Sequence, residues 1–128
     1  MRLQLRPGNL AVCRLDPQDR VPDWATGDFF SITRTPEELS IVCESQLVAE
    51  GLRAETDWRA LKVEGPLDFA LTGILVSIAA PLAATGIAIF AVSTFDTDYI
   101  LVKKDKLDRA IGALRAVGHE VAGADMVR

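Results

Sequence analysis

The residues that could carry out chemistry in this chain are few, beginning with two cysteines and one histidine. Cys13 and Cys43 each lie in an apolar run, where a free thiol usually acts as a small buried hydrophobe, and they lack the CxxC spacing of a zinc or redox site. His119 is distant from both along the chain and follows Gly118 at an expected helix end, so we expect it at the surface. We therefore expect no metal site, no cofactor and no Cys–His nucleophile.

Four carboxylates form a second candidate group, in two predicted hairpin turns. Glu37 and Glu38 lie in the first turn, and Asp96 and Asp98 lie in the second. Acidic residues are common in turns because they bond nearby backbone groups, and these spacings do not favour acid–base catalysis. Since the sequence also contains no pairing of a nucleophile with a base, we expect that the protein is not an enzyme.

Length and charge exclude further classes. The 128 residues suffice for one domain or two small modules, and the formal net charge is −4. Basic residues are scattered, with Lys103 and Lys104 as the only adjacent pair, so no stripe could neutralise phosphates and no nucleic-acid partner is expected. The N-terminal residues contain no apolar segment of a secretory signal. A cytoplasmic protein is the expectation.

The longest uncharged segment runs over 27 residues, from Phe69 to Phe95, and is long enough to cross a bilayer as one helix. Gly73, Pro81 and Gly86 interrupt it, and the residues after Gly86 are rich in β-branched and aromatic side chains, which favour a strand. A buried helix followed by a buried strand therefore explains the segment better than a membrane span, and no membrane partner is expected.

The boundaries of these two elements follow from the same punctuation. We expect a helix from Gly73 to Thr85, with Thr72 as its N-cap and Gly86 at its C′ position, and a strand from Ile87 to Thr94. Pro81 removes one backbone hydrogen bond from the helix and predicts a kink there.

The remaining elements follow from apolar periodicity and turn residues. Expected strands cover 10–15, 29–34, 39–44, 58–64, 98–102 and 119–122, a short helical turn covers 22–25, and a helix covers 104–117. The C-terminal half thus has the ferredoxin-like order βαββαβ. The N-terminal half is a degenerate copy, since FFSITRTPEELSIVCE echoes FAVSTFDTDYILVKK. The predicted class is α+β, with modules 1–64 and 65–128 and antiparallel sheets covered by helices on one face.

Several motifs carry a family resemblance. The run Gly73 to Val76, the later Ala80 to Ala83 and the hairpin Ser93 to Val102 resemble the ACT-domain family, in its tandem form related to the CASTOR arginine sensors and aspartokinase regulatory domains. Phe30 to Ser40 is similar to the first ACT module of that family, so the resemblance covers Leu10 to Val117. It implies a stand-alone, non-catalytic regulatory module that binds an amino acid.

The resemblance also implies where the ligand lies, between two ACT units and beside a helix start and the following hairpin. The first N–H groups of a helix lack partners and would bind the α-carboxylate. A carboxylate at the hairpin, Asp98, would bind the α-ammonium, and neighbouring residues would form the walls. The predicted ligand-binding residues are Ser31, Ile32, Gly73, Ile74, Leu75, Thr94, Phe95 and Asp98.

One departure from the family concerns ligand identity. The resemblance implies that arginine sensors have an acidic residue two places before the glycine, where this chain has Leu71. An uncharged wall disfavours arginine and favours a smaller or apolar amino acid. The alternative is a structural or protein-interaction module whose pocket is filled by Leu71 and Phe95 and which binds no metabolite. An exposed edge strand predicts a homo-oligomer, most simply a homodimer.

Overall fold

The computed structural model describes residues 1–65, 68 and 72–123, arranged as two compact units. Unit 1 comprises Met1–Pro7 and Arg59–Arg128, and unit 2 comprises Gly8–Trp58. These units differ from the predicted modules 1–64 and 65–128, because the first strand of the chain joins the sheet of unit 1. The division into modules at residue 64 stays a prediction.

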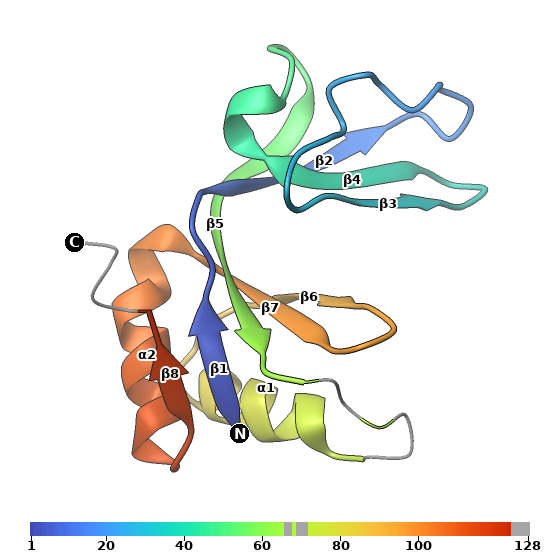
Figure 1. Ribbon diagram of the computed structural model, residues 1–128. Coiled ribbons are helices and arrows are strands. Elements are labelled where there is room, and N and C mark those ends of the chain that lie inside the picture. Colours follow the sequence, from blue (N-terminus) through green and yellow to red (C-terminus); the bar gives the residue numbers. More distant parts are fainter. Residues whose placement is uncertain (66–67, 69–71, 124–128) are drawn as a thin grey trace. The chain divides into compact units, whose positions relative to one another are not determined.

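Unit 1 contains the predicted ferredoxin-like order, and the α+β class is confirmed (Figure 1). The elements in chain order are β5 (Arg53–Val63), α1 (Ile74–Ala84), β6 (Phe90–Ser93), β7 (Asp98–Lys103), α2 (Leu107–Ala116) and β8 (Glu120–Ala122). Strand β5 begins before the expected start at Trp58. Its first residues were not predicted as strand because they are polar and exposed and show no apolar alternation.

A strand that the sequence analysis did not predict, β1 (Arg2–Leu5), lies between β5 and β8. It pairs antiparallel with β5, with Leu3 opposite Val63, and parallel with β8, with Leu3 opposite Val121. Together with the pairing of β7 with β5 and β6, this gives unit 1 the strand order β8-β1-β5-β7-β6.

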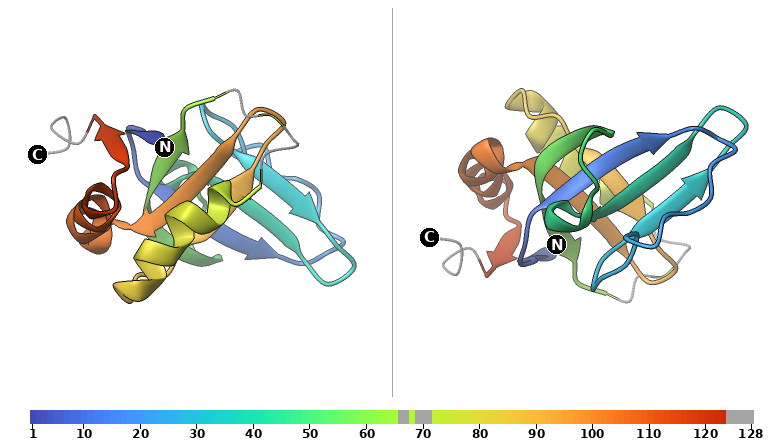
Figure 2. Two further views of the ribbon diagram at one scale, coloured as in Figure 1. Left: turned by 90° about the horizontal axis from the view of Figure 1, so that it is seen from below. Right: turned by 90° about the horizontal axis from the view of Figure 1, so that it is seen from above.

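The core of unit 1 lies between one face of this sheet and both helices. Alternate residues of β1, β5 and β7 point to the same face, and α1 and α2 cover it (Figure 2). Ile78 and Leu82 are the fully buried residues of α1, and Leu114 is fully buried in α2. The other buried members of this core are Leu3, Leu5, Leu61, Val63, Ile87, Ile100, Val102, Leu107, Ala110, Ile111 and Val121.

Both helices end in the same way, at a glycine in the left-handed conformation. After α1, Gly86 (φ 77°) donates to the carbonyl of Ala83 and Ile87 donates to that of Leu82, which is the pairing of a Schellman motif. The predicted C′ position of Gly86 is therefore confirmed. The start differs, because Gly73 and not Thr72 is the N-cap.

Among the described residues, no helix combines the length and the apolar character that crossing a membrane would require.

Unit 2 is a sheet with little helix. Its strands are β2 (Leu10–Leu15), β3 (Ser31–Arg34), β4 (Leu39–Glu44) and the first half of β5, in the order β3-β4-β2-β5. A 3-10 turn at Ser45–Leu47 is the helical element that the structure describes here, and the assignment of this half as a degenerate module stays a prediction. Its core contains Ala11, Cys13, Ala25, Leu39, Ile41 and Cys43.

Candidate functional site

The start of α1 presents backbone N–H groups that no described side chain caps. Gly73 is the N-cap with φ 77°, a conformation that side chains of L-residues rarely adopt. A Cβ built on Gly73 would meet none of the described atoms within 4 Å, so the backbone is accessible at this point. Its carbonyl accepts a hydrogen bond from the Ser77 amide at 2.9 Å, which closes the first turn. The unpaired amides and the helix dipole favour an anionic group here.

The predicted residues Ile74 and Leu75 play different parts in this turn. The side chain of Ile74 packs against the core, so only its backbone is directed to the helix start. Leu75 is exposed, as is Val76 beside it. Helix α1 contains no charged residue, so the exposed side chains Leu75 and Val76 of its first turn are both apolar.

The hairpin between β6 and β7 brings together the other predicted residues of unit 1. The Ser93 hydroxyl donates to Oδ1 of Asp98 at 2.6 Å and so fixes the orientation of this half-buried carboxylate. Thr94 lies at the turn itself, and its amide donates to the carbonyl of Thr97 at 2.8 Å. Phe95 follows at the tip with 79% of its surface exposed. Figure 1 and the left view of Figure 2 both place this turn and the start of α1 at the same end of unit 1.

Thr97 is a residue of this hairpin that the sequence analysis missed. It is only 5% exposed, and its hydroxyl donates to the carbonyl of Val63, at the end of β5, at 2.6 Å. The bond fixes the turn to the central strand of the sheet. A polar turn residue gives no sequence signal of such burial, because the partner is 34 residues away.

Ser31 and Ile32 lie in β3 of unit 2, which is an edge strand of that sheet. Ser31 is opposite Val42 and Ile32 is opposite Ile41, so their side chains point to opposite faces. Their backbone groups share one strand edge. Their part in ligand binding stays a prediction.

The remaining chemical candidates are engaged in structure. Burial raises the pKa of the Cys13 thiol, and burial together with the neighbouring Cys13 and Glu44 raises that of Cys43 to about 11, so both remain protonated at neutral pH. No cluster of metal-ligating side chains occurs among the residues with assigned positions. His119, expected at the surface, is partly exposed, and its ring also makes hydrogen bonds with the carbonyl of Ser77 and the amino group of Met1.

Unit 1 also contains a buried arginine, Arg59, which no sequence motif singled out. Arg59 is 6% exposed, and its Nη2 donates to the carbonyl of Arg6 at 3.0 Å. Burial lowers the pKa of its guanidinium, and its Nε has no partner in the described part of the chain. Because the arginine bonds the backbone of the chain's first segment, we assign it to the architecture of unit 1.

Comparison with known proteins supports the fold and its family. A family model of the ACT domain matches residues 53–116, which is half of the chain, and a model of an N-terminal domain matches residues 8–50. The chain is 34% identical over 97 residues to the cytosolic arginine sensor for mTORC1 subunit 1 of Bos taurus. The matched region covers 67% of this chain and 30% of the sensor. The chain therefore spans less than a third of that relative's length.

Solved structures extend the likeness over almost the whole chain. A crystal structure of a protein from Agrobacterium tumefaciens is 40% identical, covers 94% of this chain and 90% of that one, and has a TM-score of 0.89. The ligand-free regulatory subunit of aspartate kinase from Thermus thermophilus shares the fold at 12% identity, with a TM-score of 0.63 and coverage of 91% and 96%. From its architecture and the match over half of its length, this chain belongs to the ACT-domain family.

Proposed function

We propose that this protein is a non-catalytic regulatory module that binds a small amino acid at the end of unit 1 where α1 begins. The ACT family and the regulatory proteins among its relatives support an amino-acid sensing role. The observation that carries the proposal is local: Asp98, oriented by Ser93, is the first residue of β7, directly after a turn at the same end of unit 1 as the uncapped start of α1.

The two groups match the two charges that all free amino acids share. The amides at Gly73, Ile74 and Leu75 bind the α-carboxylate, because they sit at the positive end of the helix dipole. Asp98 binds the α-ammonium through the carboxylate oxygen that Ser93 does not engage. Phe95 and Thr94 form the wall beside it.

The chemistry around the helix start suggests which amino acids fit. Helix α1 contains only apolar residues and one serine, so a charged ligand side chain would find no counter-charge along it. We propose an amino acid with a small or apolar side chain. Leu71, the position that argues against arginine, lies outside the described residues.

The experiment is a thermal-shift panel of the twenty standard amino acids, repeated with Asp98→Asn and with Asp96→Asn as the matched control. Asp96 is in the same turn but exposed and without a role in the proposed site. A ligand present at about ten times its Kd should raise Tm by about 5 °C. Asp98→Asn should abolish the shift, whereas Asp96→Asn should retain it. A flat panel at millimolar concentrations refutes amino-acid binding.

A second candidate, a protein-interaction module without a metabolite, is favoured by one observation. Phe95 and Val76 expose 79% and 66% of their surfaces, and exposed apolar side chains can contribute to a protein-interaction surface. A flat ligand panel, combined with loss of a complex on Phe95→Ser, would support this alternative.

The proposal includes a cytoplasmic location and a homodimer. The location is supported by the cytosolic sensors among the relatives. The homodimer is supported by β6, an edge strand of unit 1, because an edge can pair with another copy. Light scattering after size exclusion measures the mass directly, and a monomeric mass at all concentrations refutes the dimer.

A further inference from the structure

The carbonyl of Ser77 has a partner that an ordinary helix would not provide. Pro81 lies inside α1 and has no N–H, so the bond that residue 81 would make to the carbonyl of residue 77 is missing. Nε2 of His119 lies 2.8 Å from this carbonyl oxygen. The imidazole thus takes the place of the missing amide donor.

The chemistry of the two contacts fixes the roles of the ring nitrogens. A carbonyl oxygen only accepts, so Nε2 must carry the proton and donate to Ser77. Nδ1 lies 3.1 Å from the amino group of Met1, which donates when it is an ammonium. The neutral Nε2–H form of His119 satisfies both contacts, and the bond to Ser77 needs only the proton on Nε2.

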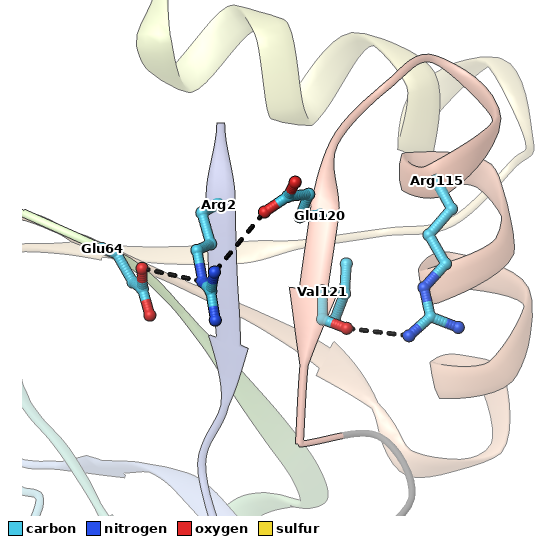
Figure 3. Close-up of polar contacts among 5 residues, drawn as sticks. All are labelled: Arg2, Glu64, Arg115, Glu120 and Val121. Carbon is cyan, nitrogen blue, oxygen red and sulfur yellow. Dashed lines mark hydrogen bonds and ion pairs between the residues drawn. The ribbon is translucent and has the colours of Figure 1, made fainter.

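Several bonds hold His119 in place. It follows Gly118 at the end of α2, where its amide donates to the carbonyl of Leu114 at 3.1 Å. The next residue, Glu120, donates its amide to the carbonyl of Met1 and pairs through its carboxylate with Arg2 at 3.6 Å. Figure 3 shows Arg2 between Glu120 and Glu64, and Arg115 of α2 donating to the carbonyl of Val121. Hydrogen bonds and an ion pair therefore hold the segment that carries the imidazole.

The acceptor of this bond belongs to the residue that closes the first turn of α1. The Ser77 amide donates to the carbonyl of Gly73, and its hydroxyl donates to the carbonyl of Ile74 at 2.7 Å. His119 thus contacts a residue that bonds the carbonyls of both Gly73 and Ile74. A displacement of Ser77 would change the direction of the free amides at Gly73 and Ile74.

We propose that His119 is a positioning residue: it replaces the donor that Pro81 lacks, holds Ser77 and so sets the geometry of the first turn of α1. The effect on ligand affinity rests on the proposed function, whereas the effect on the turn does not. The effect of removing the His119 side chain should depend on Pro81, because an alanine at position 81 restores the amide donor within the helix.

The test is a double-mutant cycle of His119→Ala and Pro81→Ala, with His119→Gln as the conservative variant. Amide hydrogen exchange at Ser77 reports the bond to Gly73, and thermal shift with the twenty amino acids reports the affinity. In the Pro81 background, His119→Ala should speed exchange at Ser77 about fivefold and weaken the best ligand by a similar factor. In the Pro81→Ala background, the same change should alter both by less than about twofold.

The outcomes separate the two proposals. Equal effects of His119→Ala in both backgrounds, or unchanged exchange in the Pro81 background, overturn the replacement of the missing donor. Faster exchange with unchanged ligand affinity overturns the positioning role. If amide exchange at Ser77 behaves as expected in all four proteins but no amino acid binds, the proposed function is refuted. The bond from His119 to Ser77 as a replacement for the missing donor is then still supported. If His119→Ala does not fold alone, its folding once Pro81→Ala is added supports the replacement, and failure of that double variant overturns it.

Discussion

In each unit, two antiparallel strands are joined by a turn that begins with a threonine and has the same hydrogen bonds. Thr35 to Glu38 joins β3 to β4 in unit 2, and Thr94 to Thr97 joins β6 to β7 in unit 1. In each turn the first amide donates to the fourth carbonyl, at 2.9 Å and 2.8 Å respectively. The threonine hydroxyl also bonds that carbonyl and the fourth amide. This repeated geometry supports the internal duplication that the two similar sequence segments suggest.

The turns differ at the positions where a ligand or the core can be contacted. The second residue is Pro36 in unit 2, whose fixed φ suits a rigid turn, and the exposed Phe95 in unit 1. The fourth residue is Glu38 in unit 2, whereas Thr97 of unit 1 is buried and bonded to β5. The same turn therefore serves as a simple connection in unit 2 and as an anchored element of the proposed site in unit 1.

The cores differ in a similar way. Unit 1 buries two helices against its sheet, while unit 2 has a smaller core that includes both thiols of the chain. The core of unit 2 therefore depends on the packing of its sheet and on keeping its buried cysteines neutral.

The largest effect should come from raising the pH. Cys43 has a folded pKa of about 11 against 9.0 for the ordinary thiol, so the folded form keeps its proton where the unfolded form releases it. The contribution of this raised pKa to the free energy of unfolding is complete below pH 9 and is lost as the pH rises through 11. We expect the free energy of unfolding by urea to fall by about 2 kcal/mol more in the wild type than in Cys43→Ala between pH 8 and 11.

The difference between the two proteins removes the titration of lysines and tyrosine, which they share. Parallel curves for wild type and variant would show that the thiol is not protected by burial. Keeping the thiol of Cys43 neutral would then not distinguish the core of unit 2 from that of unit 1.

A smaller effect tests the anchored turn. Thr97→Val keeps the shape of the side chain but leaves the buried carbonyl of Val63 without its hydroxyl donor. We expect a loss of about 1.5 kcal/mol in the free energy of unfolding. The matched change Glu38→Ala in unit 2 should cost less than about 0.5 kcal/mol, because its backbone bonds remain. Equal losses would contradict the difference between the turns.

These examples show which parts of the structure the sequence predicts. Gly86 and Gly118 mark helix ends because their left-handed conformation is a local requirement, and the apolar periods locate most strands. Strand β1 was missed because four alternating residues, RLQL, give a weak signal. The partners of Thr97 and His119 are 34 and 42 residues away, so no local pattern reveals those bonds.

The smallest effect tests whether the two turns are equivalent where they are alike. Thr94→Val and Thr35→Val each remove the hydroxyl that bonds the amide of the fourth residue. Because both hydroxyls are near the surface and water can replace them, each change should cost about 1 kcal/mol in urea unfolding. The two costs should agree within about 0.5 kcal/mol. A much larger cost for Thr94 alone would mean that this hydroxyl also supports the Thr97 anchor, and the duplicated turn would then have diverged in its hydrogen bonds as well as in its side chains.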